Sequence, residues 1–319
     1  MIEPSPVAYP PDPRITGAET LLEIVADGGP RLGFGHLGRC LALWDELGER
    51  AVFRVGDAAA NDFLSARGVP IAAGGEAPIV LLDRAAPAGE QQVRALQAHG
   101  RRVALLDDLG PARALADLVI DPPTAAAWPS AAGLRLAGFE HVLLRREVLA
   151  ARARTVRGEQ VLICIGGSDP DGLTPLLADA LAAGGVDVRS VLGPGYRGER
   201  PAAGAVLDRP GEFVPALAAA GVLVAGYGHS LLEAAHLGVP AIAVVSRAEQ
   251  LQHARAFCRH GSARLLDATA GHAALHEVAA IATELLADPA QLAAMALRGP
   301  QLIDGHGAPR VAQALEGLL

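Results

Sequence analysis

The sequence predicts an α/β protein with two domains, each built on a parallel β-sheet. Its 319 residues exceed the roughly 100–150 that one domain usually holds. Hydrophobic residues make up 51% of the chain but aromatic residues only 3%, so the cores must consist of Ala, Leu and Val, which suits helices packed on parallel strands. Short apolar runs alternate with helical patterns throughout, as in βαβ units.

The first half is predicted to form one Rossmann-like unit. Apolar runs at 21–26, 51–55, 78–82 and 103–107 indicate strands, and a helical pattern follows each of the first three. In the helix expected from about residue 37, apolar residues recur at helical spacing, so this face should pack on the sheet. These residues are Leu37, Leu41, Trp44 and Leu47.

The second half repeats this organisation, with strands expected at 161–165, 188–193, 222–226 and 241–245. Between residues 149 and 160 the chain loses its apolar period and gathers arginines, which is typical of an exposed crossover between domains. We therefore expect a flexible N-terminal extension at 1–20, an N-terminal domain at 21–150 and a C-terminal domain at 151–319.

Charge and cysteine content exclude several function classes. The formal charge of −8 argues against a nucleic-acid partner, because phosphate backbones are bound by dense Lys/Arg surfaces. The three cysteines are widely spaced, which indicates neither a metal site nor a disulfide framework and fits a reducing cytoplasm. The chain starts without the basic and apolar segments of a signal peptide. Its longest apolar stretch, 214–225, is too short for a membrane span of ~20 residues.

Three glycine-rich turns follow predicted strands and precede predicted helices. Glycine lets the backbone approach a ligand closely, and the helix N-terminus offers unpaired N–H groups to a phosphate. Each turn taken alone is as readily a plain connection, but three of them in two domains favour ligand binding at the strand ends. They contain Gly33, Gly35 and His36; Gly166, Gly167 and Ser168; and Gly226, Gly228, His229 and Ser230.

The first turn presents His36 at the start of its helix, and Arg39 follows one turn later on the same face. An imidazole is well suited to take a proton from water or a hydroxyl near neutral pH. Taken by itself, a histidine here is more often a helix cap or a solvated loop residue.

Several carboxylates stand at positions where they can bind hydroxyl groups. Glu233 lies on the first turn after the third glycine turn, where it can accept hydrogen bonds from ribose hydroxyls or simply match the helix dipole. Other acids end strands or open turns, where they can grip sugar hydroxyls, orient His36 or cap turns. They are Asp27, Asp83, Asp107 and Asp108.

Motifs spread along the chain resemble one known family. GFGHLGRCLAL (33–43) is similar to the GxGHxxRCLAL signature of the PseG/SpsG group, the UDP-sugar hydrolases of pseudaminic acid synthesis and their spore-coat relatives. Further segments fall in that family's order over nearly the whole chain. They are LLDD (105–108), ADLVIDPP (116–123), GFEHVLLRREV (138–148), GGSDPDGLT (166–174), GHSLLEAAHLGVP (228–240) and DGHGAPRV (304–311).

The resemblance implies a GT-B fold, in which two Rossmann-like domains face each other across a cleft, and an enzyme without metal or cofactor. It implies that His36 aims water at the anomeric carbon of a UDP-linked diacetamido-trideoxy sugar, which releases UDP with inversion. Enzymes of flagellin or surface-glycan synthesis would be its partners. The implied substrate contacts are Asp27, Gly33, Gly35, Arg39, Asp83, Gly166, Gly167, Ser168, Gly228, His229, Ser230, Glu233 and Gln250.

The chain departs from the family pattern at three positions expected to touch the sugar. Val25, Ala85 and Glu249 stand where the family usually has Arg, Tyr and Asn. The resemblance therefore leaves the sugar open. Two further functions also stay open, namely a glycosyltransferase in which His36 deprotonates an acceptor hydroxyl, and a binding partner that has lost catalysis.

Overall fold

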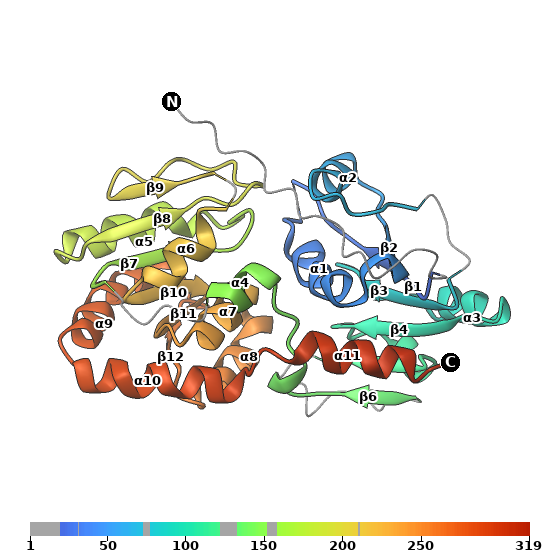
Figure 1. Ribbon diagram of the computed structural model, residues 1–319. Helices are drawn as coiled ribbons and strands as arrows, with labels where there is room; N and C mark the ends of the chain where they lie inside the picture. The colour runs from blue at the N-terminus through green and yellow to red at the C-terminus, as the bar shows by residue number, and fades with distance from the viewer. Residues whose placement is uncertain (1–19, 31, 73–76, 122–132, 152–157, 210) are drawn as a thin grey trace.

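A computed structural model describes residues 20–319 apart from 31, 73–76, 122–132, 152–157 and 210. The chain forms two six-stranded parallel sheets, ordered β2-β1-β3-β4-β5-β6 and β12-β11-β10-β7-β8-β9, which lie in separate halves of the molecule (Figure 1). The predicted N-terminal extension lies outside the described residues except for Thr20.

The strands of the two sheets have the following bounds. The first sheet contains β1 (Leu22–Ala26), β2 (Ala51–Arg54), β3 (Ile79–Asp83), β4 (Arg102–Leu106), β5 (Leu118–Ile120) and β6 (Leu134–Leu136). The second contains β7 (Val161–Cys164), β8 (Val188–Val191), β9 (Ala205–Leu207), β10 (Val222–Gly226), β11 (Ala241–Val245) and β12 (Ala263–Asp267).

All eight strands expected from the sequence are present, and the sheets add four more. Three of the added strands, β5, β6 and β9, have three residues each, too few for a period to be read. The fourth, β12, is an edge strand with charged residues among its five.

The helices are α1 (Gly35–Leu47), α2 (Ala58–Ser65), α3 (Glu90–Ala98), α4 (Arg146–Ala151), α5 (Leu173–Ala183), α6 (Phe213–Ala219), α7 (His229–Leu237), α8 (Ala248–Cys258), α9 (Glu277–Leu286), α10 (Pro289–Leu302) and α11 (Gly307–Glu316).

Helix α1 packs on the first sheet as its sequence period predicts. Leu37, Leu41 and Leu47 are buried in one cluster with Leu22 and Ile24 of β1, and Trp44 packs against that cluster. This packing fixes the start of α1, and with it His36, at the carboxyl end of β1.

The chain crosses between the halves twice. Residues 139–148 contribute buried side chains to the core of the second sheet, although they precede the predicted division near residue 151. The C-terminal helix α11 buries Val311 and Leu315 in the core of the first sheet beside α1 (Figure 1). The division at residue 151 stays a prediction. The core of each sheet contains side chains from the part of the chain assigned to the other domain.

No single helix among the described residues is long and apolar enough to cross a membrane. One bent pair, 272–286 with 289–316, meets the length and composition criteria only when its two parts are taken together.

Candidate active site

His36 and Asp83 form a hydrogen-bonded pair at the carboxyl end of the first sheet. The turn before α1 is shaped by Gly33, whose φ of 76° suits glycine, and α1 then begins at Gly35. Asp83 is the last residue of β3, opposite Ala26 of β1 in the sheet register. The His36 Nδ1 atom lies 2.6 Å from Asp83 Oδ1.

The protonation of this pair follows from its charges. Burial alone would raise the pKa of Asp83, but the Arg39 guanidinium and the hydrogen bonds from Arg39 and His36 hold that pKa well below its usual range. The ionised Asp83 therefore accepts the Nδ1–H of His36, and the Arg39 nitrogen 3.2 Å from Nδ1 is only a close neighbour. This tautomer leaves the Nε2 lone pair of His36 available to accept a proton.

Arg39 ties the pair to a second strand end. Its guanidinium donates to both Asp83 oxygens, at 2.7 and 2.6 Å, and to Asp107 Oδ2 at 2.8 Å. Cys40 is buried and donates its thiol hydrogen to Asp83 Oδ2, with 3.2 Å between the sulfur and the oxygen. Asp83 has no exposed side-chain surface, whereas a quarter of the His36 side chain is exposed. His36 is thus the member of the pair that a ligand can reach.

The glycine turns of the two halves touch each other. A Cβ on Gly167 would lie only 3.3 Å from the Cα of Gly33, and one on Gly193 would lie 2.4 Å from the Gly167 carbonyl oxygen. Gly166, which directly precedes Gly167, has a φ of 75°. The first two turns predicted from the sequence therefore meet across the junction between the halves.

The third turn begins α7, with Gly228 before its first residue, His229. Burial lowers the pKa of His229, Glu233 opposes that shift, and Arg39 and Arg145 add to it, so this ring is neutral near pH 7. Its Nε2 is buried without a hydrogen-bond partner in the part of the chain that the structure describes. Ser230 Oγ lies 3.6 Å from Cys164 Sγ at the end of β7.

Glu233 is bound by Arg145, a residue that no sequence pattern links to it. Arg145 donates through Nε and Nη2 to the two Glu233 oxygens, at 2.7 and 2.9 Å. Only 1% of the Glu233 side chain is exposed. In this conformation Arg145 covers the carboxylate that the sequence predicts to bind ribose hydroxyls. Arg145 lies in the family-like segment 138–148, and its partner stands 88 positions later in the chain.

The remaining predicted residues make other contacts within the described part of the chain. Asp27 accepts a hydrogen bond from the Ala85 amide and pairs with Arg84 at 3.5 Å. Asp108 accepts a hydrogen bond from the Gly110 amide, which caps its own turn, and another from the Ala88 amide 20 residues earlier. Gln250 lies on the first turn of α8. No cluster of metal-binding side chains occurs within the described part of the chain.

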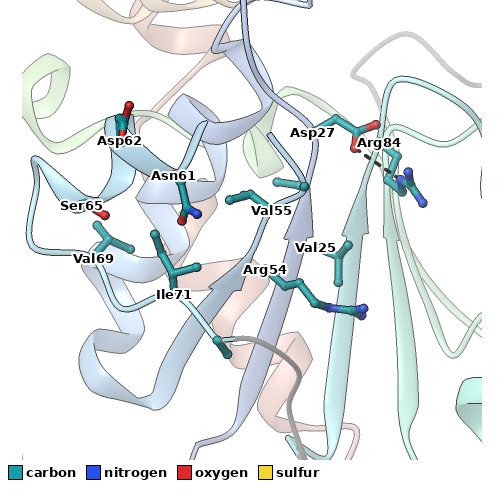
Figure 2. A pocket seen from close by; sticks show the side chains of 13 residues that line it. Val25, Asp27, Arg54, Val55, Asn61, Asp62, Ser65, Val69, Ile71 and Arg84 are labelled. Carbon is teal, nitrogen blue, oxygen red and sulfur yellow. Dashed lines mark ion pairs between the residues drawn. The ribbon is translucent and has the colours of Figure 1, made fainter. Parts of the chain in front are cut away.

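A cavity of about 990 Å³ opens at the carboxyl ends of β1 and β2 (Figure 2). Arg54 extends toward Val25 on one side of it, the Asp27–Arg84 pair lies above, and α2 carries polar side chains on the other side. Arg54 also contacts buried Glu23, with 2.5 Å between Nε and Oε1. The other polar residues lining the cavity are Asn61, Asp62 and Ser65.

Known structures share this architecture. The chain matches MurG of Acinetobacter baumannii with a TM-score of 0.63 and 15% identity, over 93% of this chain and 99% of that one. It matches the spinosyn rhamnosyltransferase SpnG at 0.62 and 18%, over 93% and 100%. A putative UDP-N-acetylglucosamine 2-epimerase from Listeria monocytogenes matches at 0.59 and 14%, over 94% and 96%. The fold is therefore GT-B, as predicted. No family model and no curated protein sequence matches the chain.

Proposed function

We propose that the protein hydrolyses a nucleotide sugar, with His36 as the general base. The observation that carries the proposal is the His36–Asp83 hydrogen bond of 2.6 Å, made where the glycine turns of the two halves meet. It supplies an oriented base beside backbone N–H groups suited to a diphosphate. The solved structures with this fold include enzymes named for UDP sugars, and the motif resemblance favours a UDP-sugar hydrolase of surface-glycan synthesis.

The reaction we propose needs one proton transfer and one displacement. His36 Nε2 takes a proton from water as the water oxygen attacks the anomeric carbon on the face opposite the diphosphate. The bond from that carbon to the phosphate oxygen breaks, and the nucleoside diphosphate leaves with the electron pair. Amides of the Gly166–Ser168 turn and the start of α7 stabilise the charge on the leaving group. Asp83 keeps Nδ1 protonated and stabilises the imidazolium.

A release assay tests this proposal. UDP is measured after incubation with a panel of UDP sugars, and His36→Ala should lower kcat by about 10²–10⁴ because the base is lost. Arg200→Gln, at an exposed ion pair of the second half, is the control and should leave the rate unchanged. Release that survives His36→Ala at the full rate contradicts the assignment.

Glycosyl transfer is the second candidate, and the cavity beside β1 and β2 favours it. Its mixed polar and apolar lining, with Arg54, Asn61 and Ser65, suits a hydroxylated acceptor at the carboxyl ends of β1 and β2. In that case an acceptor hydroxyl replaces water as the nucleophile. UDP release that requires an added acceptor, with a KM for the acceptor raised by Arg54→Ala, decides for transfer.

A further inference from the structure

Arg145 separates the buried carboxylate of Glu233 from solvent. Arg145 directly precedes α4 on the segment that passes between the halves. Glu233 is the fifth residue of α7 and lies just beyond the first turn on which the sequence places it. The two bonds of 2.7 and 2.9 Å engage both carboxylate oxygens. Arg145 keeps 30% of its side chain exposed, while Glu233 keeps 1%. An entering ligand therefore meets the guanidinium first.

Arg145 also lies close to the proposed base. A Cβ on Gly38, two residues after His36 in α1, would lie 3.8 Å from Arg145 Cδ. On the other side, the guanidinium carbon is 5.6 Å from the centre of the Phe213 ring. Arg39 and Arg145 both lower the pKa of His229, and Glu147 and Glu233 supply the negative charge near Arg145. The cation thus stands between the helix that carries His36 and the helix that begins with His229.

A phosphate can replace Glu233 as the partner of Arg145. The planar guanidinium binds carboxylate and phosphate with the same two-pronged geometry. A phosphate at the start of α7 would also receive backbone N–H groups there. Once the guanidinium turns away, the Glu233 carboxylate would lose its charged partner. It would then gain hydrogen bonds from two ribose hydroxyls.

We propose that Arg145 and Glu233 are an exchangeable pair: a nucleoside diphosphate draws Arg145 onto its phosphates and thereby opens Glu233 to the ribose. The inference rests on the proposed function, because both use one nucleotide site. It adds a phosphate contact at Arg145 and a coupling between phosphate and ribose recognition. The two parts of the nucleotide must then bind cooperatively.

The test measures this cooperativity on the wild-type protein by calorimetry, with uridine and pyrophosphate as separate probes. Saturating pyrophosphate should lower the Kd of uridine on the order of tenfold, because the energy of one charge-assisted hydrogen bond no longer opposes ribose binding. In Arg145→Gln the Kd of uridine should not respond to pyrophosphate. Arg200→Gln removes an exposed arginine of the same half and should keep the full response.

Glu233→Gln provides a second measurement. With the carboxylate charge gone, Arg145 is released, so pyrophosphate should bind this variant about tenfold more tightly than wild type and uridine less tightly. A uridine Kd that pyrophosphate leaves unchanged in the wild type overturns the exchange, even where UDP binds well. Absence of UDP binding to the wild type overturns the proposed function itself, and the exchange with it.

Discussion

Gly33 and Gly167 bring the two halves into backbone contact. A Cβ on Gly167 would lie 3.3 Å from Gly33 Cα and 3.5 Å from the Phe34 amide nitrogen, so the two turns meet with no side chain between them. The base and the proposed phosphate-binding amides are close because of this contact. Any bulk added here should separate them.

Adding a methyl group at Gly193, which packs against Gly167, should destabilise the protein. In Gly193→Ala the new Cβ would stand 2.4 Å from the Gly167 carbonyl oxygen, so backbone must shift. We expect a loss of roughly 1–3 kcal/mol in the free energy of unfolding. Chemical denaturation with urea measures it.

Gly35→Ala is the matched control for this variant. Nothing lies within 4 Å of a Cβ at this first residue of α1, and its φ needs no glycine. We expect unchanged or slightly increased stability, by up to about 1 kcal/mol. Equal losses in the two alanine variants would contradict the account of the contact.

Loss of the Asp83 charge should impair the base without removing it. In Asp83→Asn the amide oxygen can still accept from His36 Nδ1, but nothing stabilises the imidazolium, and Arg39 loses its main partner. We expect kcat to fall by about 10²–10⁴ while the KM changes little. Steady-state UDP release measures both. A tenfold rise in KM with unchanged kcat would instead indicate a substrate-binding role for this residue.

The sequence alone predicted eight of the twelve described strands, because buried parallel strands appear as apolar runs. It also placed His36 and Arg39 on one helix face, and both do bond to Asp83. It could not predict that Arg145 pairs with Glu233, because the two residues are 88 positions apart and their contact depends on how the halves pack. The position of α11 escaped prediction for the same reason, since an amphipathic period does not tell which sheet covers it.

Removing a carboxylate where α1 meets α4 should stabilise the protein above neutral pH. Partial desolvation raises the pKa of the Asp45 carboxyl, which keeps contact with solvent, to about 6, with Glu147 adding to the shift and Arg146 opposing it. The folded state therefore binds a proton that the unfolded state has lost between pH 4 and 6, and stability falls as pH rises through that window. Asp45→Asn avoids this cost.

The expected gain for Asp45→Asn is about 1 kcal/mol at pH 7.5, reduced from the full shift because solvent reaches the carboxylate. The gain should shrink toward zero near pH 4, where wild-type Asp45 is protonated in the folded state. Urea denaturation at pH 4, 6 and 7.5 measures the difference. A gain that is the same at all three values would assign the effect to packing rather than to the charge of Asp45.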